Sequence, residues 1–310
     1  MGQQRGFVIS PVNGETVVKE DWLHKNIEFL SSPVCEGRAS ATPGMVWAAE
    51  WIRHSFLQAG LVPFDDCWVD GFPLDGGGAG HNVMGMIPGS GDEYVIIMSH
   101  YDNLGILGGN MYPGADSNAS GVVAMVALTR MFRRMTDLGK SYRKNIIFVG
   151  LDGKNRNFSG AKALYQKIAG GQLKNPVTGK IIGKKNVSLV INIDQLGSTE
   201  APLTPGVREY MIMLGDEAYA RRDLMAIANR DRRLDLELGF SYYGSKDFTR
   251  LFLTQVCDQK IFLEGKMRAV LITSGITMRN NKPSDTSDGI DYPVFRKRIA
   301  LIFHWLSKWV

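Results

Sequence analysis

Two residues after the first strongly apolar run have the side chains to bind a metal or move a proton. The run YVIIMS (94–99) leads directly into His100 and Asp102. An imidazole can ligate a metal while a neighbouring carboxylate orients its ring. A His–Asp hydrogen bond that only holds a loop is the structural alternative. The pair alone does not distinguish a metal ligand from a structural hydrogen bond.

Two more carboxylates occupy comparable places. Asp116 lies in the loop GADSNASG ahead of a predicted helix, where capping the helix is the usual role of such a residue. Its neighbours Ser117 and Asn118 could cap equally well, which leaves Asp116 free to face a site. Asp194 follows the apolar run VSLVINI, and a turn before Gly197 is its structural alternative. Histidine with carboxylates is a zinc-ligand combination.

The segments around these residues predict an α/β fold. We expect strands at 94–99, 145–151, 187–193, 210–214 and 269–273, and helices at 18–32, 43–60, 120–135, 158–168, 216–229, 245–253 and 293–309. Their alternation predicts a single three-layer α/β/α domain over 1–310, with a mainly parallel mixed sheet. Segment 170–185 is predicted to be an exposed insertion. Sites in such sheets form beyond the carboxyl ends of strands, where the three polar groups stand.

Composition restricts the class of protein. The chain of 310 residues is 44% hydrophobic and 22% charged, as expected of a soluble globular protein, and its net charge is +5. Basic clusters at 221–233 and 296–298 are predicted to be solvated helix faces, and no nucleic-acid motif accompanies them. No apolar stretch reaches about 18 residues, so we expect no transmembrane segment.

The cysteines and the N-terminus leave several alternatives open. Cys35, Cys67 and Cys257 have no metal-knuckle spacing, and their disulfide state cannot be read from the sequence. The first ten residues lack the apolar core of a signal peptide. The protein is therefore cytosolic, or the given chain starts after a removed signal.

Taken together and in order, the motifs resemble metallopeptidase family 28, the zinc-dependent aminopeptidase and glutamate-carboxypeptidase-like exopeptidases. The resemblance covers nearly the whole chain. It rests on CEGR with TPG (35–38, 42–44), HNVMGMIPG (81–89), SHYD (99–102), PGADSNASG (113–121), TSGI (273–276) and PSDT (283–286). It implies a zinc-exopeptidase-like fold, and its members are often exported, which favours a periplasmic, envelope or secreted location.

The resemblance also implies which residues would ligate zinc. Asp116 matches the carboxylate that bridges two zinc ions, and His100 and Asp194 match the other ligands of one of them. Where the family has its general-base glutamate this chain has Lys154, and Asn155 stands at the neighbouring zinc carboxylate.

A third departure lies near the C-terminus. Asn281 replaces the histidine that would ligate the second zinc. An ammonium cannot act as a carboxylate base, and an amide oxygen is a poor zinc ligand. We expect Lys154 to occupy the place of the lost metal and to pair with Asp116. The family's glutaminyl cyclases match poorly, because they keep the half of the site that is missing here.

Two main functions follow from these residues. The first is a non-catalytic protein with no zinc that binds a peptide, a glycan or a partner protein in the former active-site cleft. The alternative is a single-metal aminopeptidase or amidohydrolase with one zinc at His100, Asp116 and Asp194. Its base would then come from another acid, with Asp152, Glu200, Asp247 and Asp285 as candidates. A purely structural role in an assembly is a third hypothesis.

Overall fold

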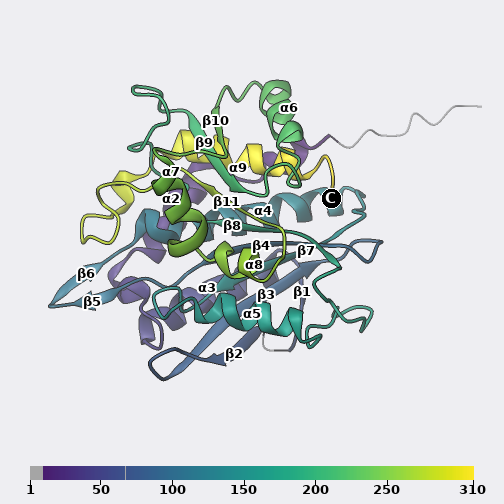
Figure 1. Cartoon of the computed structure of the whole chain (residues 1–310), viewed down its shortest axis with the longest axis horizontal. Helices are drawn as coiled ribbons and strands as arrows, with labels where there is room; N and C mark the ends of the chain where they lie inside the picture. Colours follow the sequence, from purple (N-terminus) through teal and green to yellow (C-terminus); the bar gives the residue numbers. More distant parts are fainter. Residues whose placement is uncertain (1–9, 67) are drawn as a thin grey trace, which may run out of the picture.

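A nine-stranded sheet runs through the protein. The computed structural model describes residues 10–66 and 68–310, and Figure 1 shows the sheet with helices around it. The strand order is β1-β3-β7-β4-β8-β11-β9-β10, with β2 paired to β3. The strands are β1 (Val62–Pro63), β2 (Val69–Pro73), β3 (Ala79–Ile87), β4 (Tyr94–His100), β7 (Asn145–Leu151), β8 (Val187–Ile193), β9 (Tyr210–Gly215), β10 (Glu237–Phe240) and β11 (Ala269–Thr273).

The centre of this sheet is parallel. Strand β4 pairs in parallel with β7 and β8, and β11 pairs in parallel with β8. Antiparallel pairing joins β3 to β7 and β9 to β11. The predicted mainly parallel mixed sheet is therefore confirmed.

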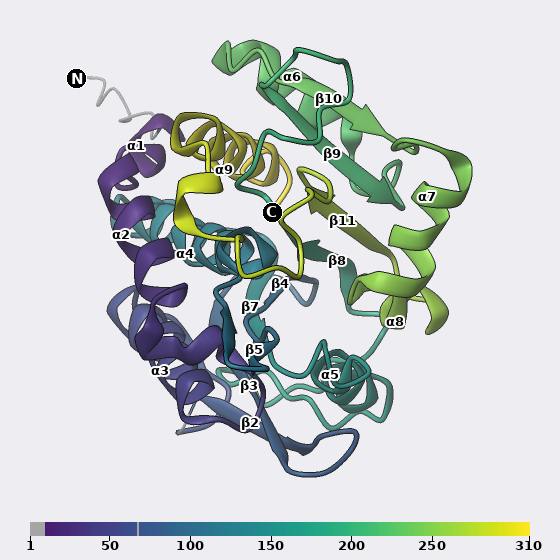
Figure 2. The same cartoon turned by 90° about the vertical axis from the view of Figure 1, so that its left-hand side faces the viewer.

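Helices cover both faces of the sheet, as Figure 2 shows. One core cluster joins one face to α2, α3, α4 and α9, and a second joins the opposite face to α5 and α8. The helices are α1 (Val12–Glu15), α2 (Glu20–Leu30), α3 (Pro43–Gln58), α4 (Gly121–Asp137), α5 (Ser159–Ala169), α6 (Arg222–Arg232), α7 (Lys246–Leu251), α8 (Gln259–Glu264) and α9 (Tyr292–Leu306). The three-layer α/β/α prediction is confirmed. Among the described residues no helix is both long and apolar enough to cross a bilayer.

Several short elements escaped the sequence patterns. The hairpin of β5 (Gly105–Leu107) and β6 (Asn110–Tyr112), strand β10 and helix α8 were not predicted. Each is six residues or fewer, which is too short to show a period. The predicted helix at 216–229 begins later than expected, at Arg222. Segment 170–185 is a loop with one bridge between Lys174 and Ile181.

Buried arginine Arg38 ties the N-terminal segment to two loops near the ends of the central strands. Its guanidinium donates to the carbonyl oxygens of Tyr101 (2.9 Å), Pro113 (2.7 Å) and Gly114 (2.8 Å), and also to that of Leu30. The side chain is fully buried. The CEGR motif therefore positions the loops that precede and follow the β5–β6 hairpin.

A second buried arginine corrects the prediction that 296–298 is a solvated face. Arg298 is fully buried, and it donates to the carbonyl oxygens of Tyr210 (2.6 Å), Leu196 (2.8 Å) and Ser198 (2.7 Å). Only Arg296 and its neighbour Lys297 face outward within this run. The period of α9 turns Arg298 toward the sheet, and carbonyl groups after β8 stabilise its charge.

The two neighbouring cations of α9 should therefore respond differently to substitution. We expect Arg298→Met to lower the free energy of unfolding by about 3 kcal/mol or more, because buried carbonyl oxygens lose their donors. Lys297→Met is the matched control, since the Lys297 ammonium forms a half-exposed ion pair with Glu209. Urea denaturation of both variants measures the difference. Equal losses would contradict the structural role of Arg298.

Candidate functional site

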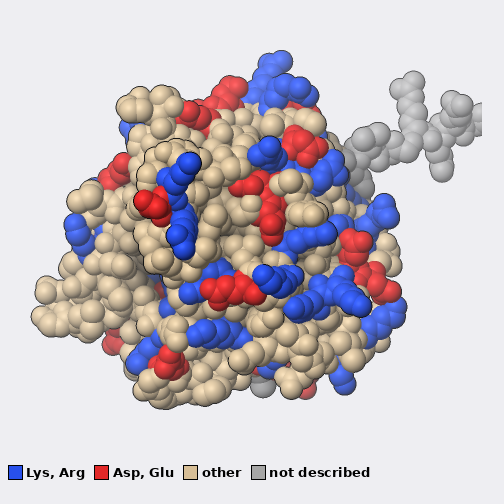
Figure 3. Space-filling view, in the orientation of Figure 1, with Lys and Arg blue, Asp and Glu red and all other residues tan. Residues whose placement is uncertain are grey.

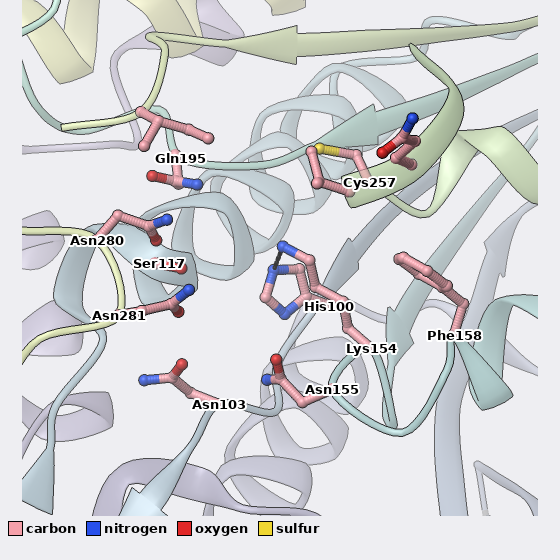
Figure 4. Close-up of a pocket in the computed structure, with 13 residues that line it drawn as sticks. His100, Asn103, Ser117, Lys154, Asn155, Phe158, Gln195, Cys257, Asn280 and Asn281 are labelled. Carbon is pink, nitrogen blue, oxygen red and sulfur yellow. Dashed lines mark hydrogen bonds between the residues drawn. The ribbon is translucent and has the colours of Figure 1, made fainter. Parts of the chain in front are cut away.

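The central parallel strands end side by side and open into a pocket. Strands β4, β7 and β8 deliver His100, Lys154 and Gln195 to its floor and walls. The pocket has a volume of about 280 Å³, and Figure 4 shows its residues from several separate segments. It is lined by His100, Asn103, Ser117, Lys154, Asn155, Phe158, Gln195, Gln255, Val256, Cys257, Ile276, Asn280 and Asn281.

The ammonium of Lys154 lies between two candidate metal ligands. Its Nζ is 2.9 Å from Oδ2 of Asp194 and 3.0 Å from Nε2 of His100. The Asp194 side chain is 1% exposed and that of Lys154 is 15% exposed, so the ion pair is shielded from water. Figure 4 shows the Lys154 side chain reaching up to the His100 ring.

The sequence predicts a different carboxylate as the partner of the Lys154 ammonium. The prediction that Lys154 pairs with Asp116 is wrong, because its ammonium pairs with Asp194. Oδ1 of Asp116 instead accepts hydrogen bonds from Ser120 Oγ (2.9 Å) and from the backbone N–H of Gly197 (2.8 Å). This set of donors holds Asp116 against the loop after β8.

His100 donates one hydrogen bond and accepts another. Its Nδ1 lies 3.0 Å from the carbonyl oxygen of Asp102, and its Nε2 faces Lys154. Burial and the Lys154 ammonium lower the pKa of His100, whereas the carboxylates of Asp194 and Asp102 raise it. A protonated ring, however, would turn an N–H toward the ammonium. The 3.0 Å contact requires a neutral ring with its proton on Nδ1, and this is the state that we assign.

The electrostatics of the pair follow from burial and proximity. Burial raises the pKa of Asp194, but the Lys154 ammonium outweighs it and holds the pKa well below its usual range. Burial lowers the pKa of Lys154, yet Asp194 outweighs it and raises the pKa above the ordinary value. Both side chains therefore stay charged at neutral pH.

Asp102 acts mainly on the loop after β7. Its carboxylate accepts the backbone N–H of Lys154 (3.0 Å) and that of Asn155 (3.1 Å). The carboxylate is farther from the imidazole, with Oδ1 3.7 Å from Nδ1 of His100. Asp102 thus orients His100 chiefly through its carbonyl oxygen, and its side chain fixes the backbone that carries Lys154.

Carboxamides dominate the rest of the pocket. Asn155 and Asn281, which stand at lost ligand positions, lie in it together with Asn103, Gln195, Gln255 and Asn280. The Asn155 amide is turned toward Asp102, with Nδ2 3.4 Å from Oδ2. The buried Oδ1 of Asn280 has no hydrogen-bond partner in the described structure. These groups come from segments far apart in the sequence. No local sequence pattern predicted that Asn103, Gln195, Gln255 or Asn280 would line the pocket.

The other candidate acids lie outside the pocket. Asp152 accepts from Ser40 Oγ (2.6 Å), and Glu200 pairs with Arg279 (3.2 Å). Asp285 accepts the backbone N–H groups of Asp116 and Ser117 at 2.9 and 3.0 Å. The last one, Asp247, is exposed in the first turn of α7. None of these four acids lines the pocket.

Two residues that sequence reasoning missed lie directly before α8. Cys257 lines the pocket, and burial raises the pKa of its thiol well above the usual value. Burial also raises the pKa of Asp258 to about 6, and neither of its carboxylate oxygens has a hydrogen-bond partner in the described structure. Cys35 and Cys257 are both free and buried, and Cys67 lies outside the described residues, as do residues 1–9.

The residues of this arrangement do not fit a zinc ion. Two atoms that a metal would need, Nε2 of His100 and Oδ2 of Asp194, both receive the Lys154 ammonium. Over residues 10–66 and 68–310, no group of three or more His, Cys, Asp or Glu side chains is disposed to hold a metal. One oxygen each of Asp116 and Asp194 remains buried without a partner. The three-residue ligand set His100, Asp116 and Asp194 therefore stays a prediction.

A comparison with known protein families identifies the family of this chain. The sequence model of peptidase family M28 matches residues 82–306, which is more than half of the chain. The chain belongs to peptidase family M28. The resemblance inferred from the motifs is thus confirmed.

The individual relatives are distant. The BOS complex subunit NCLN of Gallus gallus is 28% identical over 59% of this chain and 32% of its own length. The alkaline phosphatase isozyme conversion protein of Escherichia coli is 28% identical over 61% of this chain and 54% of its own length. This chain therefore spans between about a third and about half of these two relatives.

Solved structures share the fold at low identity. The aminopeptidase LapA of Legionella pneumophila has a TM-score of 0.70 at 15% identity, over 99% of this chain and 77% of its own. The glutaminyl cyclase of Macrostomum lignano has a TM-score of 0.74 at 13% identity, over 99% of this chain and 95% of its own. At such identities the likeness concerns the fold alone.

The buried Lys154–Asp194 pair should contribute strongly to stability. We expect Lys154→Met to lower the free energy of unfolding by about 3–5 kcal/mol, because Asp194 would remain buried without its counter-charge. Lys180→Met is the control, since the Lys180–Asp92 pair is equally short at 2.8 Å but more than 60% exposed on both sides. We expect a much smaller loss there, because solvent screens an exposed ion pair. Chemical denaturation measures both, and similar losses would argue against a buried pair.

Proposed function

We propose that this chain is a non-catalytic member of family M28 that binds a peptide or a partner protein in the pocket at the ends of β4, β7 and β8. One observation carries the proposal: the Lys154 ammonium donates to both Asp194 and His100. A cation in this place repels a divalent metal and occupies the ligand atoms that the metal would use. Among the described residues, no carboxylate lines this pocket.

The lining of the pocket supports a ligand of amide chemistry. A carboxamide offers both a donor and an acceptor, as a peptide group does. Phe158, Val256 and Ile276 add apolar surface beside the amides. A few directed polar groups on an apolar wall are typical of binding sites. The chicken relative is named as a subunit of a complex, which favours a protein as the source of the bound segment.

The first test concerns the metal. After dialysis against trace zinc, we expect the unmodified protein to retain less than one equivalent. The triple variant Lys154→Glu, Asn155→Glu and Asn281→His should gain bound zinc. Asn155→Glu and Asn281→His restore two zinc ligands, and Lys154→Glu restores the base and removes the repelling cation. Elemental analysis measures the zinc.

The control for this test makes the same changes at exposed positions. Lys25→Glu, Asn13→Glu and Asn110→His alter charge and composition identically but lie outside the pocket. One tightly held zinc in the unmodified protein, lost in Asp194→Ala, would overturn the proposal and establish the single-metal hydrolase. Release of an aminoacyl chromophore by that zinc-loaded protein would then be the next measurement.

A second test concerns the ligand. We expect Gln255→Trp, which fills the pocket from an exposed position, to abolish binding of short peptides selected on the unmodified protein. Thr254→Trp is the matched control, one residue away and outside the pocket. Fluorescence polarisation with labelled peptides measures affinity. Equal binding by both variants would show that the selected peptides bind elsewhere.

The compartment is also part of the proposal. Relatives of this family are often exported, and we propose a periplasmic, envelope or secreted location for this protein as well. Fractionation of cells that express the complete natural gene product would test it. Recovery in the cytosol alone would exclude export.

A further inference from the structure

The edge of the sheet opposite the pocket carries a concentrated positive charge. Lys184 and Lys185 lie within three residues before the start of β8, and Lys266 and Arg268 lie within three residues before the start of β11. We call these four residues the basic hollow, because they line a depression of about 390 Å³ with Glu93 as the only acid among its lining residues. All four side chains are exposed.

Strand pairing explains why these cations meet. Strands β8 and β11 are parallel neighbours, with Val190 opposite Ala269. Residues that precede two parallel neighbours must lie at the same edge of the sheet. Figure 3 shows Lys and Arg side chains gathered below the middle and on the right of the face, the side on which the central strands begin in Figure 1.

The four cations have no carboxylate partner among the described residues. Nζ of Lys184 donates to the carbonyl oxygen of Gly265 at 2.7 Å. The Arg268 guanidinium lies over the Tyr219 ring, 3.8 Å from its centroid. No ion pair or side-chain hydrogen bond involves Lys185 or Lys266 in the described structure. Solvent and counter-ions must therefore offset the repulsion among these four cations.

Nearby acids are already engaged. Glu93 pairs with Lys144 at 2.9 Å and accepts from Ser188 Oγ at 3.0 Å. Asp216, which lies near the start of β11, accepts the backbone N–H of Ala269 at 3.0 Å. Each carboxylate thus has its own partner, and the basic hollow stays positive.

The other arginine-rich cluster of the chain differs in this respect. On α6, Arg221 pairs with Asp223 at 3.1 Å and Arg230 pairs with Asp231 at 3.2 Å. Arg221 and Arg230 therefore each have an acid beside them. The basic hollow differs in that its four cations line one depression and none of them has a carboxylate partner among the described residues.

We propose that the basic hollow binds a phosphate group, carried either by a free phosphate compound or by a lipid headgroup. A phosphate brings up to two negative charges and several acceptor oxygens to one point, and lysine and arginine are its usual partners. Donors from the two loops that precede β8 and β11 line this depression. The proposal is independent of the pocket at the other edge of the sheet.

The test uses two probes and two double variants. Inorganic pyrophosphate is titrated by calorimetry, and vesicles of phosphatidylcholine with or without phosphatidic acid are used for co-sedimentation. We expect Lys185→Gln with Lys266→Gln to weaken binding by roughly tenfold or more, and added salt to weaken it further. Arg221→Gln with Arg230→Gln removes the same charge from paired positions and should leave binding unchanged.

Each outcome bears on the proposal. Pyrophosphate binding that the first variant loses supports a free phosphate ligand, and binding only to vesicles that contain phosphatidic acid supports a headgroup. No binding of either probe to the unmodified protein overturns the proposal. Equal weakening in both variants also overturns it, since net charge alone would then account for the effect. Thermal melting of both variants verifies that they fold.

Discussion

An ammonium group shielded from water is the interaction around which the candidate site is built. Lys154 can keep its charge there only because Asp194 lies 2.9 Å away and His100 accepts a second hydrogen bond. The carboxylate of Asp102 fixes the Lys154 backbone from below. Removing any one of these groups would leave another buried and unpaired. The charge of the Lys154 side chain therefore constrains the loop after β7, which carries this residue.

Two buried arginines impose a similar constraint on the surrounding loops. Arg38 joins the N-terminal segment to Pro113 and Gly114, just ahead of Asp116, and Arg298 joins α9 to the loop that follows β8. Both guanidiniums satisfy backbone carbonyl oxygens that would otherwise lie buried without donors. The ends of the parallel strands can thus present polar groups to one pocket while the loops that carry them stay ordered.

Sequence patterns predict this fold well where apolar runs are long. Strands β4, β7 and β8 and helices α3 and α4 stand within about two residues of their predicted bounds. The partner of Lys154 could not be predicted in the same way. Asp116 and Asp194 both follow strand ends, and what separates them is that Gly197 and Ser120 already occupy an oxygen of Asp116. Such a competition between donors exists only in three dimensions.

The same limit applies to charge. Arg296, Lys297 and Arg298 form one run in the sequence, yet one of them is a buried structural donor. Conversely, Lys185 and Lys266 are separated by 80 residues and share one depression without any acid to pair with. Positive charge without a carboxylate partner among the described residues is therefore concentrated where β8 and β11 begin. At the edge with the pocket, each cation that contacts the site residues meets a carboxylate or carbonyl oxygen, whereas at the opposite edge the balancing charge must come from outside the chain.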